Sequence, residues 1–170
     1  IFFDTGEILC IDPRRFATLT LHCGPAVLRN RSVNLLAGMN IAEIRARAGD
    51  RRLPVKAFLL DQQVMPGMGN IYACEILFAA AVSPWRRTGD VTAVEWDRIA
   101  AAAGSILKEA VHCRGTSISD WRDLFGRPGE YQRRLKVYDR EGKICFRCPA
   151  RIERRKISGR GTYYCPGCQK

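Results

Sequence analysis

The sequence predicts an α+β protein in three parts: the end of a sheet domain, a helical domain, and a small C-terminal finger built on a β-hairpin. Alternating residues with turn chemistry at positions 4–6 and 12–13 predict strand, turn, strand at the start of the chain. Two capping patterns ahead of apolar stripes predict helices in the middle. Two closely spaced cysteine pairs near the end predict a metal-stapled finger.

These signals also place the boundaries. We assign residues 1–23 to the tail of an N-terminal sheet domain and residues 24–38, which include Pro25 and several asparagines, to a linker. Residues 39–132 are the predicted helical domain, and residues 133–170 are the predicted finger.

Capping patterns locate two helices. Asn40 with Glu43, and Thr92 with Glu95, have the spacing of a capping box. The second pair precedes a stripe at helical spacing, made of Trp96, Ile99, Ala103, Ile106 and Ala110. Between the two pairs, residues 71–81 are apolar on nearly every side, which predicts a central buried helix.

A further helix is expected to start at Pro54, with Val55 and Phe58 on its apolar face and Lys56 pointing elsewhere. The turn-rich residues 64–70 then lead into the buried helix. Free amides and the positive end of a helix dipole make that junction a candidate anion site, to which Asn70 could contribute. Plain capping of the helix by Asn70 is the alternative.

The finger carries the clearest motif. Cys145 and Cys148, then Cys165 and Cys168, form two Cys-x-x-Cys pairs separated by sixteen residues. This spacing is typical of one tetrahedral zinc ion, and because all four positions are filled by thiolates the zinc should be structural. Two disulfides are the alternative, disfavoured because no secretory leader precedes them and cytosolic thiols stay reduced.

Two hairpins are expected around these cysteines. One spans residues 135–144 and turns at 140–142. The other runs from Ile152 to Cys165, with residues 158–161 as its tip, and its two glycines permit a tight turn that directs Arg160 outward.

The finger also holds most of the charge. Residues 133–170 contain twelve Lys or Arg and three Asp or Glu, so they carry nine of the eleven formal positive charges. A compact basic unit favours phosphate contacts, although a merely solubilising tail is the alternative. The sequence contains no run of eighteen apolar residues and no signal-peptide pattern, so a cytoplasmic protein without a membrane partner is expected. Four further cysteines lack ligand spacing and are expected to be buried and inert: Cys10, Cys23, Cys74 and Cys113.

Together these motifs resemble formamidopyrimidine-DNA glycosylase over nearly the whole chain. The resemblance is carried by residues 60–75 (LDQQVMPGMGNIYACE), 12–16 (DPRRF), 115–117 (GTS), 129–138 (GEYQRRLKVY) and the finger ending TYYC at 162–165. It implies the remnant of a β-sandwich domain, a helix-two-turns-helix domain and a zinc finger with one structural zinc. It further implies a monomeric bacterial base-excision enzyme, associated with the nucleoid, that flips oxidised purines such as 8-oxoguanine and formamidopyrimidine out of duplex DNA.

The resemblance also implies roles for residues at the sequence level. Arg14 and Phe16 match residues that enter the space vacated by the lesion, the arginine at the orphaned base and the ring as a wedge. Ordinary core packing is the alternative for Phe16.

Four other positions match DNA contacts. Lys56 and Asn70 match the phosphate grip of the helix-two-turns-helix, and Arg51 lies where a basic contact is expected, although Arg52 could serve instead. Arg160 matches the catalytic arginine that clamps the phosphate beside the lesion and assists the second elimination as a proton donor; its permanent charge makes the clamp the better-founded role.

One departure from the family pattern is large. The family's nucleophile is the amine of an N-terminal proline followed by a glutamate, with an essential lysine in the same domain, and this sequence contains none of them. The chain is therefore expected to be the C-terminal part of the enzyme, able to bind DNA and inactive alone. Pro66 and Ala17 are smaller departures. A non-catalytic zinc-dependent DNA-binding module is the alternative, and a zinc-stapled protein-interaction domain is a third.

Overall fold

The computed structural model describes residues 2–7, 40–119, 122–123 and 125–170. The chain divides into two compact units, residues 1–30 and 31–170, each described here by itself. The predicted linker at 24–38 and the predicted wedge residues Arg14 and Phe16 lie outside the described residues, as do Cys10 and Cys23.

The first unit contains one short hairpin. Strands β1 (Phe2–Phe3) and β2 (Gly6–Glu7) are antiparallel, with Phe3 opposite Gly6. The turn at residues 4–5 is where the sequence predicts one. The assignment of this segment to a β-sandwich stays a prediction.

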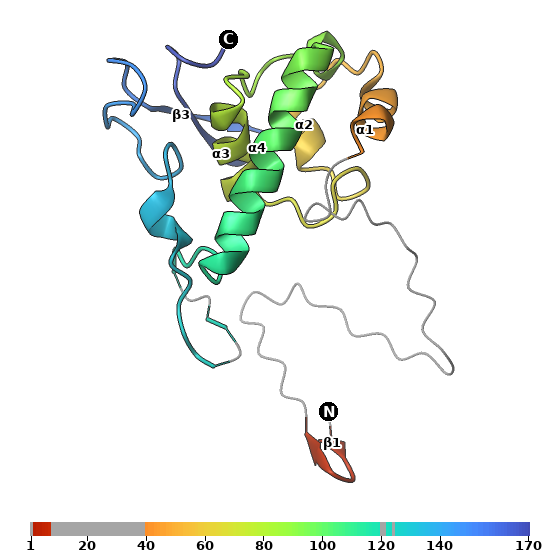
Figure 1. The fold of residues 1–170 in the computed structure, drawn as a ribbon, viewed down its shortest axis with the longest axis vertical. Helices are drawn as coiled ribbons and strands as arrows, with labels where there is room; N and C mark the ends of the chain where they lie inside the picture. The colour runs from red at the N-terminus through yellow and green to blue at the C-terminus, as the bar shows by residue number, and fades with distance from the viewer. Residues whose placement is uncertain (1, 8–39, 120–121, 124) are drawn as a thin grey trace. The chain divides into compact units, whose positions relative to one another are not determined.

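The second unit is helical in its first part (Figure 1). Its helices are α1 (Ile41–Ala48), α2 (Val55–Leu59), α3 (Asn70–Ala79), α4 (Ala93–His112), and the 3-10 turns η1 (Thr88–Asp90) and η2 (Tyr131–Arg134). The long α4 packs along α3, whose residues 73–78 are all buried, as the apolar sequence predicts. No helix among the described residues combines the length and apolar character needed to cross a membrane.

The two predicted capping boxes differ in outcome. At α4 both reciprocal bonds form, so the Thr92 hydroxyl accepts from the Glu95 amide and the Glu95 carboxylate accepts from the Thr92 amide. At α1 the Asn40 side chain accepts from the Glu43 amide at 3.2 Å. The Glu43 carboxylate pairs with Arg47 one turn later, so this cap is only half of a box.

Replacing Thr92 by alanine tests this cap. We expect Thr92→Ala to lower the free energy of unfolding by about 1 kcal/mol, because it leaves an N-terminal amide of α4 without a partner. Urea denaturation, monitored by circular dichroism, measures the change in the free energy of unfolding. Ser105→Ala, an exposed substitution within α4, is the matched control, and an equal loss in both variants would contradict the capping role.

The helical core lies where α1 to α4 meet. The Phe58 ring meets the Trp96 ring edge-on, with centroids 5.8 Å apart. Val55, Phe58 and Leu59 are fully buried, as predicted for the apolar face of α2. Lys56 is also 0% exposed, and it points elsewhere than these side chains, toward α3 and the finger.

The finger packs directly on α3. Cys74 and Phe78 share a buried cluster with Val137, Ile152 and Cys165. The buried Glu75 carboxylate accepts hydrogen bonds from the backbone amides of residues 136, 137 and 138 at 2.8–2.9 Å. Because the first residues of the finger satisfy this carboxylate, the finger is fixed to the helical part rather than tethered to it.

The second predicted hairpin is confirmed. Strands β3 (Glu153–Ile157) and β4 (Arg160–Tyr164) are antiparallel, and Ile157 lies opposite Arg160. Their turn consists of Ser158 and Gly159 alone, both with positive φ (50° and 75°), as tight two-residue hairpin turns require. The tip is therefore shorter than predicted, and Arg160 begins β4.

The first predicted hairpin, over residues 135–144, is wrong. That segment forms turns, since its potential partners are used elsewhere: residues 136–138 bind Glu75. The chain from Gly142 to Cys145 pairs instead with residues 150–152, through Gly142 N to Ile152 O at 2.8 Å and Cys145 N to Ala150 O at 2.9 Å.

Candidate metal centre and nucleic-acid interface

The four finger cysteines converge on one point. The sulfur atoms of Cys145, Cys148, Cys165 and Cys168 all lie within 4.8 Å of one another. The individual Sγ separations are 3.4 Å for Cys148 to Cys165, 3.4 Å for Cys148 to Cys168, and 3.8 Å for Cys145 to Cys168. A disulfide needs about 2.05 Å, so these four thiols are not paired into two disulfides.

The geometry fits a tetrahedral metal. Four sulfurs at 2.3 Å from a zinc ion would lie about 3.8 Å apart, which is close to the separations found. The second knuckle is also shaped around a sulfur. A Cβ added to Gly167 would lie 2.8 Å from the Cys148 sulfur, so the chain approaches this sulfur more closely than any other residue permits. The residues present therefore fit a structural zinc.

Lys56 lies at the centre of a second cluster. Its ammonium donates to Asn70 Oδ1 at 2.6 Å, to Thr162 Oγ1 at 2.8 Å and to the Gly161 carbonyl at 3.1 Å. Asn70 Nδ2 also donates to the Gly161 carbonyl, at 3.0 Å. Three acceptors match the three N–H bonds of an ammonium. Lys56 thus links α2, the start of α3 and strand β4.

The surroundings of Lys56 disfavour its charge. Burial lowers the pKa of Lys56, and the positive charge of Arg160 lowers it further, while the nearby Cys74 sulfur acts in the opposite direction. Burial raises the pKa of the Cys74 thiol. Cys74 and Cys113 are buried, as the sequence predicts for inert thiols.

The start of α3 is open to an anion. Gly69 is the N-cap and no side chain caps the helix, so the first amides of α3 have no intrahelical partner. Asn70 is the first helical residue and its side chain bonds to Lys56 and Gly161, so the capping alternative for Asn70 is not what the structure shows. The preceding turn is braced by Gln62, which donates to the Met68 carbonyl and accepts from the Gly67 amide.

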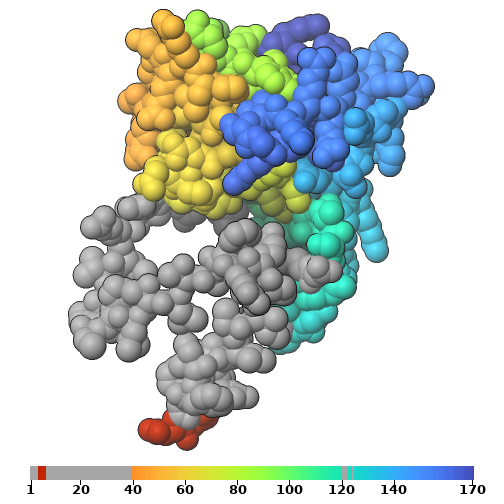
Figure 2. Space-filling model, turned by 180° about the vertical axis from the view of Figure 1, so that it is seen from behind, coloured from red at the N-terminus to blue at the C-terminus, as the bar shows by residue number. Residues whose placement is uncertain are grey.

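Arg160 is exposed beside this helix start. Its neighbour Gly161 is bonded to both Lys56 and Asn70, so the backbone beside the arginine is fixed to the start of α3, and the charge of Arg160 acts on Lys56. Its guanidinium has no hydrogen-bond or ion-pair partner within the described part of the chain. Figure 2 shows the finger, in blue, beside the helical residues in orange and yellow on one face of this unit.

The structure thus brings together three of the predicted contacts: Lys56, Asn70 and Arg160. Arg51 is not joined to them by any contact between described residues. Its guanidinium lies 5.5 Å from the centroid of the Phe58 ring, and 4.0 Å separates it from the Asp61 carboxylate. The DNA contacts proposed for Arg51, Arg14 and Phe16 stay predictions.

Sequence reasoning missed two residues that build the site. Thr162 receives the Lys56 bond, and Glu75 fixes the finger to α3. Lys56 and Thr162 are 106 positions apart, so no local pattern signals their contact. For Glu75, the available signal was a charged side chain within a largely apolar helix.

Comparison with known proteins identifies relatives of the whole described unit. The family described as Formamidopyrimidine-DNA glycosylase H2TH domain matches residues 34–121. A formamidopyrimidine-DNA glycosylase from Desulfitobacterium hafniense is 37% identical over 171 residues, which cover 97% of this chain and 63% of the relative. The chain thus spans somewhat under two thirds of the relative's length.

Solved structures of Fpg proteins also resemble this chain. The MutM (Fpg) protein from Thermus thermophilus superposes with a TM-score of 0.73 at 38% identity, over 83% of this chain and 57% of that chain. A Lactococcus lactis Fpg variant in complex with Fapy-dG containing DNA gives a TM-score of 0.72 at 32% identity, over 77% of this chain and 48% of that chain.

Proposed function

Because this chain belongs to the formamidopyrimidine-DNA glycosylase family, we propose that it grips damaged duplex DNA as the DNA-binding part of a base-excision repair enzyme. The proposed activity of the intact protein is that of a bifunctional DNA glycosylase and AP lyase on oxidised purines, 8-oxoguanine and formamidopyrimidine among them. Its proposed place of action is the bacterial nucleoid. The Lactococcus lactis relative, whose structure holds Fapy-dG containing DNA, supports this substrate class.

One observation carries the proposal: Gly161, which directly follows the exposed Arg160, is bonded to Asn70 at the uncapped N-terminus of α3. Backbone amides and a helix dipole bind a phosphate oxygen, and a guanidinium fork binds it from a second direction. The basic finger supplies the longer-range attraction to DNA.

Each residue of the grip has a separate task. The Asn70 amide group and the first amides of α3 face the phosphate, and Arg160 clamps it. Lys56 contributes through Asn70 and Gly161, because its N–H bonds already point to protein oxygens; the direct phosphate contact predicted for it stays a proposal. Proton donation by Arg160 during elimination stays a proposal as well.

The proposed metal is one zinc ion held by Cys145, Cys148, Cys165 and Cys168. When bound, it supplies cross-linking of the two knuckles. With the metal bound, the cysteines hold β3 and β4 in a fixed position against α3. Arg160 therefore stays near the start of this helix.

Removing the guanidinium tests the grip. We expect Arg160→Ala to weaken binding to duplex DNA containing 8-oxoguanine and to reduce the slope of log K against log salt by about 1, because one phosphate contact is lost. Fluorescence anisotropy at several salt concentrations measures both.

Arg98→Ala is the matched control, since Arg98 is an exposed arginine on α4 beside Glu95. It should leave the salt slope unchanged. Equal slopes for the parent chain and Arg160→Ala would contradict the clamp. An intact gene product that cannot be trapped on lesion DNA with borohydride, yet binds that DNA, would favour the non-catalytic module instead.

A further inference from the structure

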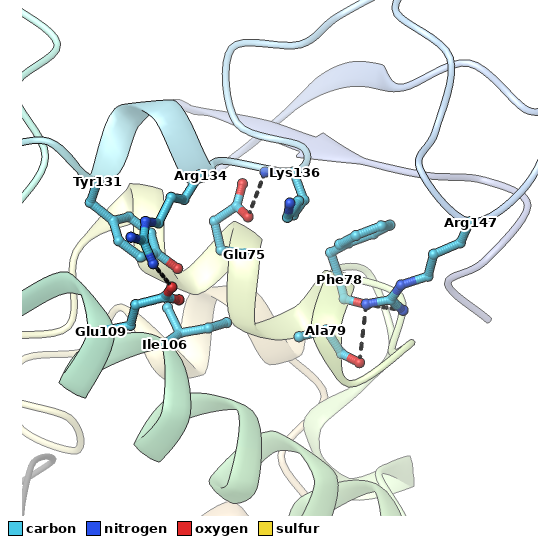
Figure 3. A pocket seen from close by; sticks show the side chains of 9 residues that line it. All are labelled: Glu75, Phe78, Ala79, Ile106, Glu109, Tyr131, Arg134, Lys136 and Arg147. Carbon is cyan, nitrogen blue, oxygen red and sulfur yellow. Dashed lines mark hydrogen bonds and ion pairs between the residues drawn. The ribbon is translucent and has the colours of Figure 1, made fainter. Parts of the chain in front are cut away.

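A pocket opens on the finger side of α3, away from the helix start. Its volume is about 480 Å³, and it lies between α3, the C-terminal half of α4, η2 and the first knuckle (Figure 3). Its lining residues are Glu75, Phe78, Ala79, Ile106, Glu109, Tyr131, Arg134, Lys136 and Arg147. The lining on α3 begins five residues after Asn70, roughly 8 Å along the helix axis from the phosphate grip. The pocket and the grip are therefore separate.

The walls of the pocket are largely apolar. Phe78 and Ala79 come from α3, Ile106 from α4 and the Tyr131 ring from η2. Such a surface favours a flat hydrocarbon body over a hydrated ion. Ala79 is exposed even though its neighbours along α3 are buried, so the pocket is reached at this residue.

The rim carries positive charge. The Glu109 carboxylate is paired with Arg134, and the Glu75 carboxylate accepts three backbone amides. Lys136 and Arg147 have no carboxylate partner among the residues that the structure describes. Lys136 lies 4.9 Å from the Phe146 ring centroid. Arg147 lies 4.0 Å from the Phe78 centroid and also donates to the Phe78 and Ala79 carbonyls, at 2.9 and 3.4 Å (Figure 3).

Tyr131 adds a hydroxyl to the lining. Tyr131 is 3% exposed, and its ring lies 5.8 Å from the ring of Tyr72, centroid to centroid. Burial raises the pKa of Tyr131, and the charges of Glu109 and Glu75 raise it further, so the group stays a donor.

We propose that this pocket is a second ligand site, which binds a small carboxylate carried on a single aromatic ring. The ring occupies the space between Phe78, Ile106 and Tyr131, and the carboxylate faces Lys136 and Arg147. Apolar walls alone would accept a neutral ring, and cations alone would accept any anion. Apolar walls together with cations favour a ligand that carries a ring and a carboxylate in one molecule.

The probe is 3-phenylpropionate, titrated into the zinc-loaded, isotope-labelled chain while backbone amide shifts are followed by NMR. We expect saturable shifts in residues 75–79 and 131–136, with a Kd on the order of 0.1–1 mM. The neutral 3-phenylpropan-1-ol and the ring-free acetate should each bind about tenfold more weakly or not at all.

Two variants locate the site. Ala79→Phe fills the pocket from an exposed position and should remove the saturable shifts, while Lys136→Met should raise the Kd about tenfold. Lys143→Met, an exposed lysine on the same knuckle but outside the lining, is the matched control and should leave the Kd unchanged. The proposal is overturned if the acid gives no saturable shifts, if the alcohol binds equally well, or if Ala79→Phe and Lys136→Met both bind as the parent does.

Discussion

Stripping zinc from the finger with a chelator should unfold residues 133–170 and release bound DNA. Structural zinc contributes on the order of 10 kcal/mol to the folding of such modules, which is comparable with the whole stability of a typical domain, about 5–15 kcal/mol. Without the metal, the β3–β4 hairpin is a two-stranded pair of marginal stability, and Arg160 at the start of β4 loses its position. The fluorescence anisotropy that reports DNA binding should fall on chelation and recover when zinc is added.

A pair of cysteine variants separates loss of metal binding from general destabilisation of the fold. Cys165→Ser removes one ligand and should lower the zinc content of the purified chain below one ion, together with DNA affinity. Cys113→Ser changes a buried cysteine at the end of α4, outside the cluster, and should keep one zinc per chain. A parent chain purified with substantially less than one tightly held zinc would contradict the metal assignment itself.

Features that follow from local sequence were predictable. The Cys-x-x-Cys spacing, the Thr92 capping box and the apolar α3 each depend on residues a few positions apart, and the structure confirms the box, the buried helix and the convergence of the four sulfurs. The outward direction of Arg160 also follows locally, because Ser158 and Gly159 force a tight turn directly before it.

Features that depend on distant partners were not predictable. An alternating segment at 135–144 favours a hairpin, but Glu75, sixty residues earlier, takes the amides that such a hairpin would use. Periodicity alone likewise placed Lys56 off the apolar face of α2 and gave no sign of its partners. It is buried because α3 and β4 together offer three oxygen atoms to its ammonium, and that arrangement exists only once the chain has folded.

Replacing Lys56 by methionine should lower the free energy of unfolding by about 2–4 kcal/mol. Methionine fills similar space, but it leaves Asn70 Oδ1 and Thr162 Oγ1 without the Lys56 donor, while the Gly161 carbonyl keeps only its bond from Asn70. The relief of desolvating a buried charge offsets part of this loss, which is why the expected cost is below the sum of three lost bonds. Urea denaturation of the zinc-loaded chain measures it, with Lys108→Met, an exposed lysine on α4, as the control.

The same variant decides how Lys56 serves DNA binding. If its main task is to hold β4 against α3, Lys56→Met loses stability and Thr162→Val, which removes one of the three acceptors, loses about 1 kcal/mol in the same direction. DNA affinity then falls because Arg160 is less firmly placed. If Lys56 instead grips a phosphate directly, its removal lowers the salt slope by about 1, as for Arg160→Ala, and leaves stability within about 0.5 kcal/mol of the parent. The three bonds to protein oxygens favour the first outcome, because a phosphate could reach the ammonium only by displacing one of them.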